Sequence, residues 1–97
     1  MNEIIAEFIN YLLRTKNYSA HTAIAYENDI RDFVNFCEKF RGTDIYIKDL
    51  SSVDTIGFRS WLADRQKRNL AHKSTARALS SVRSFYKFLE KSHSVKN

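Results

Sequence analysis

The sequence predicts an all-α protein, built as a small bundle of four helices. Pro is absent and Gly occurs only twice in 97 residues, so the residues that most strongly interrupt helices are nearly missing. Apolar residues recur at intervals of three and four in four separate segments, which is the spacing of one helix face. Hydrophobic residues make up 43% of the chain, enough for one modest core. We therefore expect a single domain that folds without a metal ion or a disulfide.

The first two helices are expected at about residues 2–15 and 20–40. The first has six apolar residues on one face: Ile4, Ile5, Phe8, Ile9, Leu12 and Leu13. Ser19 is a favourable N-cap for the second helix, and Gly42 is a natural stop. The buried stripe of this second helix is expected to comprise Tyr26, Ile30, Phe33, Val34, Cys37 and Phe40. Cys37, the only cysteine, is therefore interpreted as a core residue.

The stretch TDIYIKDL is expected to be a connection to the third helix. Ser51 stands three residues before Asp54, which is close to a capping-box arrangement that would open a helix ending at about Arg68. The fourth helix is expected from about His72 to Lys91. Its buried face is expected to comprise Leu79, Val82, Phe85, Tyr86 and Leu89. The final SHSVKN is predicted to be a polar tail that is disordered or leads to a further segment.

Positive charge is concentrated in the last third of the chain. Residues 65–97 contain nine Lys or Arg and one Glu, a balance of +8, whereas the first 64 residues carry −3. A clustered positive charge is typical of a surface that binds nucleic acid. Many basic helices are only solvated, however, so the charge alone does not decide the function.

The hydrophilic face of the fourth helix favours DNA as the partner. At about 100° per residue, a line of cations and small hydroxyls lies opposite the buried face: Lys73, Arg77, Ser80, Ser84, Lys87 and Lys91. An α-helix fits the major groove, where Lys and Arg reach phosphates and guanine edges, and Ser lets the helix axis come close. A solvated face usually mixes Glu with Lys, whereas only Glu90 is acidic here.

The second helix has an exposed face of a different chemistry. His21, Ile24, Asn28, Arg31 and Asn35 point away from its predicted core stripe, with Ala25 and Asp32 at the margin. Asn and Arg side chains suit base edges, but they are also ordinary residues on any exposed helix. The basic fourth helix gives this face its functional interpretation. Together the two faces are expected to form one saddle.

No catalytic or cofactor site is apparent in the sequence. The three His residues are scattered, and no CxxC pair, GxSxG elbow or P-loop occurs. We therefore expect no metal, no cofactor and no catalysis by this chain. No apolar run approaches the ~18 residues of a membrane span, and the N-terminus lacks the order of a signal peptide. A cytoplasmic protein without membrane contact is expected.

Two stretches that cover nearly the whole chain resemble a known family. They are FINYLLRTKNYSAHTAIAYENDIRDFVNF and SSVDTIGFRSWLADRQKRNLAHKSTARALSSVRSFYKFL. The order of an S-x-x-T cap, Tyr-x-x-Asp and a final R-x-L-S-x-x-R-x-F-Y resembles the N-terminal core-binding domain, a SAM-like helical domain, of tyrosine recombinases and phage-type integrases, most closely the Xer type. The resemblance implies an orthogonal four-helix bundle over residues 1–91. It also implies half of a clamp around duplex DNA, with two helices in the major groove.

The resemblance assigns DNA contacts by position. On the second helix they fall on His21, Thr22, Ala25, Asn28 and Arg31, and on the fourth on Lys73, Ser74 and Arg77. Ser80, Ser84 and Lys87 join them from the basic line described above. Asp32, beside Arg31, would repel phosphate if it faced DNA.

The resemblance further implies that residues 92–97 begin a linker to an absent C-terminal catalytic domain. The expected partners are a recombination half-site in duplex DNA and, in the full-length protein, other recombinase subunits, while the isolated domain is expected to be monomeric. Two alternatives remain open. One is that the chain is a helical protein-interaction module whose basic helix docks on an acidic partner. The other is that it is a natural stand-alone regulator without a catalytic domain.

Overall fold

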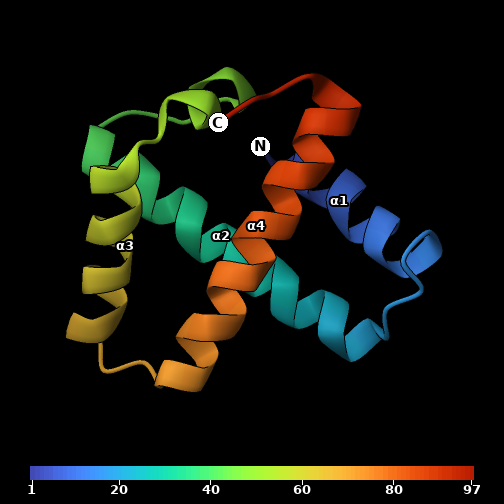
Figure 1. Cartoon of the computed structure of the whole chain (residues 1–97), viewed down its shortest axis with the longest axis horizontal. Helices are drawn as coiled ribbons and strands as arrows, with labels where there is room; N and C mark the ends of the chain where they lie inside the picture. Colours follow the sequence, from blue (N-terminus) through green and yellow to red (C-terminus); the bar gives the residue numbers. More distant parts are fainter.

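The computed structural model describes all residues 1–97 and confirms the all-α fold. Its four helices are α1 (Asn2–Arg14), α2 (Ala20–Arg41), α3 (Thr55–Lys67) and α4 (His72–His93). The helix α2 contacts each of the other three. Figure 1 shows α4 crossing α2 near the middle of both helices, with α1 and α3 on opposite sides of α4. No helix combines the length and hydrophobicity needed to cross a membrane.

The ends of α2 form as predicted. The Ser19 hydroxyl oxygen accepts a hydrogen bond from the backbone N–H of Thr22 at 3.1 Å, which satisfies one of the free amides of the first turn. At the other end Gly42 adopts φ = 74°, a left-handed conformation that glycine reaches without the steric cost of a side chain. The helix extends one residue beyond the predicted end.

The predicted start of the third helix is wrong. Ser51 belongs to a 3₁₀ helix, η1 (Ile47–Ser52), which begins inside the stretch that was expected to be a connection and ends two residues beyond it. Its hydroxyl donates to the carbonyl of Lys48 at 2.8 Å, so it caps nothing in α3. The N-cap of α3 is Asp54, whose carboxylate accepts a hydrogen bond from the backbone N–H of Gly57 at 2.9 Å.

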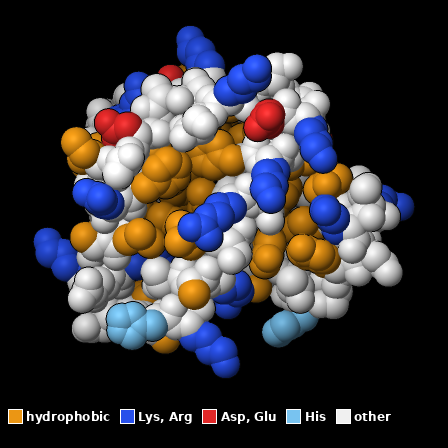
Figure 2. Space-filling model, viewed as in Figure 1, with side chains coloured by type: hydrophobic (Ala, Val, Ile, Leu, Met, Phe, Trp, Pro, Cys, Tyr) orange, Lys and Arg blue, Asp and Glu red, His pale blue; other side chains and the backbone are white.

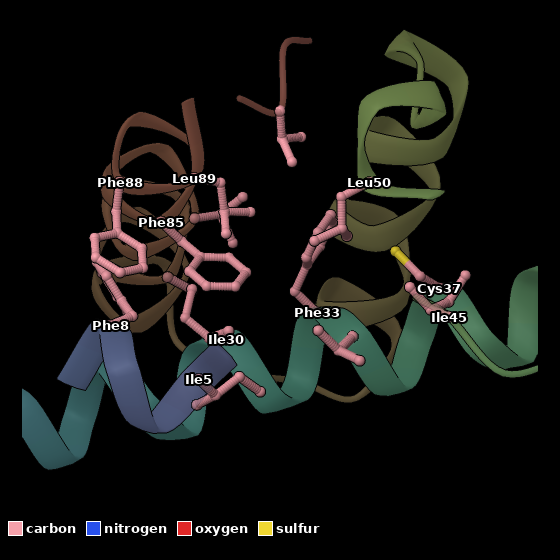
Figure 3. Packing of buried hydrophobic residues seen from close by; sticks show 14 of the residues in the cluster. Ile5, Phe8, Ile30, Phe33, Cys37, Ile45, Leu50, Phe85, Phe88 and Leu89 are labelled. Carbon is pink, nitrogen blue, oxygen red and sulfur yellow. The ribbon is translucent and has the colours of Figure 1, made fainter. Parts of the chain in front are cut away.

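The core lies between α2 and the three helices that cover it, α1, α3 and α4 (Figure 3). On one side, the ring of Phe8 from α1 lies 5.2 Å from that of Phe85 of α4. On the other, the ring of Phe33 lies 5.0 Å from that of Trp61 of α3. Cys37 is buried, as predicted. Phe40 is not, because it lies in the last turn of α2 at the edge of the core, and it is 56% exposed.

The buried face of α4 differs in part from the prediction. Val82, Phe85 and Leu89 are buried as expected, but Leu79 and Tyr86 are only partly buried. The fully covered face also includes three residues that the prediction omitted: Ala78, Ser81 and Phe88. The helix is therefore rotated slightly about its axis relative to the predicted stripe.

Of the two possibilities predicted for the final SHSVKN, disorder is wrong, and continuation into a further segment stays a prediction. Ser94 takes a left-handed conformation at the end of α4, and the backbone N–H of Val95 donates to the carbonyl of Leu89 at 3.2 Å. A left-handed residue at the end of a helix turns the chain back and commonly places an apolar residue against the helix it ends. Val95 is accordingly buried. The side-chain amide of Asn97 donates to backbone carbonyls in and after η1, at Leu50, Ser51 and Val53.

Candidate nucleic-acid interface

The N-terminal halves of α2 and α4 are joined by one polar cluster at the helix crossing. Arg77 of α4 donates from Nε and Nη2 to the two carboxylate oxygens of Asp29 of α2, both at 2.9 Å. Ser81 donates its hydroxyl proton to the same carboxylate at 2.8 Å. Beyond this Asp29–Arg77–Ser81 cluster the two half-helices diverge toward the same edge of the molecule (Figure 1). The candidate residues near the starts of both helices therefore lie toward one edge of the molecule.

On α2, this region presents a mixed polar and apolar face. His21 and Asn28 are exposed, whereas Thr22 and Ala25 are partly buried. Ile24 lies between them in the sequence and is 59% exposed, so the face offers an apolar side chain as well as an amide and an imidazole. Such a mixture suits base edges, which display both hydrogen-bonding groups and the thymine methyl.

On α4, the region is basic and its helix end is open. Lys73 and Ser80 are exposed, and Ser74 is partly buried. The N-cap of α4 is Ala71, which provides no side-chain acceptor, so the first-turn amides are not capped by the protein. Uncapped amides together with Lys73 favour negative charge at this end of the helix.

Ser84 and Lys87 lie farther along α4, beside the end of α1. With Lys91 they line a groove of about 270 Å³ whose other wall includes Lys16 and Tyr18. Lys16 was missed by the sequence reasoning because it stands in the turn between α1 and α2, where no helical periodicity assigns a face. The groove extends the positive charge of α4 toward the start of α2.

The structure does not bring Arg31 into the same region. Its guanidinium donates to Glu27 at 3.0 Å and to the side-chain oxygen of Asn2, in α1, at 2.9 Å. It lines a different pocket, together with Asn2 and Asp44. A role for Arg31 in DNA binding therefore has no geometric support beyond the resemblance.

Asp32 is held by other residues and does not stand free beside a phosphate site. Its carboxylate accepts hydrogen bonds from Arg65 at 2.8 Å, from Arg68 at 3.0 Å and from the indole N–H of Trp61 at 3.1 Å. Burial alone would raise the pKa of Asp32, but these hydrogen bonds hold it below its ordinary value. The acidic residue next to Arg31 thus fastens α2 to α3.

The charge distribution agrees with the placement of the candidate residues. Figure 2 shows Lys and Arg side chains spread over the face that contains α4, while the acidic side chains visible on it lie toward the top of the view. The lower edge, where α2 and α4 begin, shows basic and His side chains. This edge is suited to a polyanion.

Comparison with known proteins places the chain in a family. Residues 5–93 match the family described as phage integrase, N-terminal SAM-like domain. The chain belongs to this family. Its SAM-like domain is 42% identical over 91 residues to tyrosine recombinase XerC of Rickettsia typhi, covering 94% of this chain and 30% of that protein. Tyrosine recombinase XerC of Rickettsia bellii is 38% identical over 97 residues, covering all of this chain and 32% of that protein. No solved structure matches significantly.

This SAM-like integrase domain thus spans about a third of the length of the curated relatives it matches. Burial raises the pKa of two potentially nucleophilic side chains of the domain, Cys37 and Tyr86. Burial raises the pKa of the Cys37 thiol to about 11, so the thiol stays protonated at neutral pH. Burial also raises the pKa of Tyr86, whose hydroxyl donates to the carbonyl of Leu50 at 2.7 Å. No group of three or more His, Cys, Asp or Glu side chains is placed to hold a metal ion.

Proposed function

We propose that this SAM-like domain is the DNA-binding part of a site-specific tyrosine recombinase. It contacts duplex DNA through the N-terminal halves of α2 and α4 and performs no catalysis itself. The observation that carries the proposal is the Asp29–Arg77–Ser81 cluster, which sets the mixed face of α2 beside the basic face of α4. The names of the relatives, tyrosine recombinases, supply the kind of reaction in which such a domain serves.

The two faces have different roles in this proposal. Lys73 and Arg77 bind phosphates, which fixes the position of the domain on the duplex without reading its sequence. Asn28 and Ile24 lie on the face that meets base edges, where an amide pairs with adenine and an apolar side chain contacts a thymine methyl. The small side chains of Ser80 and Ser84 let the axis of α4 come close to the DNA. Lys87 adds a phosphate contact from the groove beside α1.

The remaining functions of a recombinase are assigned to the rest of the protein. The relatives are about three times as long as this chain, and we infer that strand cleavage and contact with other subunits reside in their further residues. The domain itself is proposed to be monomeric and to act in the cytoplasm. The buried position of Val95 supports a DNA-binding unit that extends beyond Lys91.

Titration of the domain with duplex DNA at several salt concentrations tests the proposal. We expect a Kd of roughly 10⁻⁴ to 10⁻⁶ M on non-cognate duplex at physiological salt, with log K falling linearly with log salt as counterions are released. Lys73→Ala should weaken binding to all duplexes about equally and lower the slope by about 0.9. Fluorescence anisotropy of a labelled duplex measures both quantities.

Two further variants separate sequence reading from general charge. Asn28→Ala should cost ~1 to 3 kcal/mol on the cognate half-site and much less on random DNA. Glu90→Gln, near the far end of the same basic helix as Lys73, is the control and should leave sequence preference unchanged. An affinity that is independent of salt, or no binding to duplex DNA, would contradict the proposed function.

One observation keeps the protein-docking alternative in consideration. Between α3 and α4 lies a groove of about 540 Å³ whose apolar lining includes Phe58, Leu62 and Leu79, with Arg83 and Lys87 beside it. Figure 2 shows the hydrophobic side chains of this hollow on the face that contains α4. Apolar lining beside cations suits an acidic amphipathic segment. The salt titration separates the two functions, because a docking module need not bind DNA.

A further inference from the structure

We propose that Asp29 and Ser81 are positioning residues that hold the Arg77 guanidinium in a fixed orientation for a DNA phosphate. This inference rests on the proposed function and deepens it, because it concerns how one contact of that interface is made. Neither residue would touch DNA itself. Asp29 is 3% exposed and Ser81 is completely buried.

The hydrogen bonds fix both the position and the plane of the guanidinium. Asp29 accepts from Nε and Nη2 of Arg77, so the two groups form a two-pronged pair that leaves little rotational freedom. The hydroxyl of Ser81 binds the Asp29 oxygen that Nε also uses, and this third hydrogen bond fixes the carboxylate in turn. No hydrogen bond within the protein engages Nη1. The Arg77 side chain is 46% exposed, so these N–H groups remain available to an external acceptor.

Pre-ordering matters because a long cationic side chain loses rotamer freedom when it binds. An exposed Lys such as Lys73 loses that freedom only on contact with DNA, and the loss reduces its net contribution. Arg77 has already lost it in the free domain. Arg is also the residue whose planar fork can hold a carboxylate on one edge and present further donors on another.

The positioning role predicts that removing the negative charge of Asp29 weakens DNA binding. Asp29 is a negative charge directly beside a phosphate-binding cation, so by charge alone its removal should strengthen binding to a polyanion. If Asp29 orients Arg77, its removal should weaken binding instead. The direction of the change therefore distinguishes positioning from simple electrostatics.

The experiment compares Asp29→Asn with Glu27→Gln in the salt titration. Both variants remove one negative charge from α2, but Glu27 pairs with Arg31 in a partly exposed contact and does not touch Arg77. We expect Asp29→Asn to bind about threefold or more weakly, with a slope lower by about 0.9, as for the loss of one phosphate contact. Glu27→Gln should bind as tightly as the parent or more tightly. Arg77→Lys keeps the charge without the fork and should behave like Asp29→Asn.

A second readout excludes a merely structural effect. In ¹⁵N spectra, the Nε–H of Arg77 should exchange slowly in the parent and rapidly in Asp29→Asn, while the backbone amide signals of α2 and α4 remain dispersed. If Asp29→Asn does not fold, Ser81→Ala decides the matter, since it keeps the ion pair and removes only the supporting hydrogen bond. It should then show weaker binding and a shallower slope than the parent.

The outcomes separate the two levels of the proposal. A parent domain that does not bind duplex DNA overturns the proposed function. A parent that binds, combined with an Asp29→Asn variant of equal or higher affinity and unchanged slope, overturns the positioning role alone. A Ser81→Ala variant whose affinity and slope equal those of the parent would also overturn the positioning role alone.

Discussion

Replacing Asp32 with Ala should lower the free energy of unfolding by about 3 to 5 kcal/mol, the range seen when one partner of a buried ion pair is removed. The reason is the environment of Arg65, whose side chain is only 5% exposed and whose Nη1 donates to Asp32 at 2.8 Å. The variant leaves this charge buried without a counter-ion. It also removes the acceptor of the Trp61 indole N–H. Urea unfolding followed by circular dichroism measures the loss.

Asp64→Ala is the matched control, because Asp64 also pairs with Arg68 but at the surface. Arg68 and Asp64 are both well exposed, at 42% and 38% of their side-chain areas, and they lie one helical turn apart in sequence. Exposed pairs of this kind contribute about 0 to 1 kcal/mol. Equal losses for Asp32→Ala and Asp64→Ala would mean that the buried cluster between α2 and α3 is not the source of the stability.

The contribution of Asp32 should also depend on pH. Its pKa lies below the ordinary value of 3.8 in the folded domain, so the folded state binds the proton more weakly than the unfolded chain does. The stabilisation is therefore fully present above the ordinary pKa and is lost as the pH falls through the lower, folded value. The difference in unfolding free energy between the parent and Asp32→Asn should be constant at neutral pH and shrink only in strong acid.

Phe33→Ala is expected to cost about 3 to 5 kcal/mol, the range for an aromatic residue removed from a packed core. Phe33 is completely buried and lies at the centre of the aromatic packing. Its ring lies 5.6 Å from that of Phe58, 5.0 Å from that of Trp61 and 6.3 Å from that of Tyr86. The substitution therefore opens a cavity between α2, α3 and α4 at once.

Phe40→Ala provides the comparison on the same helix. Phe40 is 56% exposed, and a surface substitution of this kind usually changes stability by less than about 0.5 kcal/mol. The pair is informative because the helical spacing of the sequence places both rings on one stripe. A loss at Phe40 as large as that at Phe33 would contradict the burial described for the end of α2.

The sequence predicted the helices well where local signals were strong. Ser19 and Gly42 mark the ends of α2 through local hydrogen bonding and backbone conformation, which do not depend on the rest of the fold. For the start of α3, the sequence pattern indicated Ser51 as the cap and Asp54 as its capping-box partner, whereas Asp54 is the N-cap. Only the presence of η1, too short to show a periodic pattern, assigns Ser51 to another element.

The candidate interface was only partly predictable, because it depends on how the helices cross. A helical wheel places Arg77 on the exposed line of α4 and gives Asp29 no role. The structure buries Asp29 and pairs the two across 48 positions in the sequence. The same limitation applies to Arg31, which the wheel exposes and which the start of α1 engages through Asn2. Contacts between distant segments leave no periodic signal.

The central claim, that the N-terminal halves of α2 and α4 meet duplex DNA, is tested most directly by NMR. The ¹⁵N-labelled domain is titrated with a duplex, and the shifts of the backbone amides are mapped onto the structure. We expect the largest shifts in residues 21–28 and 73–80, with smaller ones at Lys16 and Lys87. Shifts confined to α3 and η1, with residues 21–28 and 73–80 unchanged at saturating DNA, would contradict the claim.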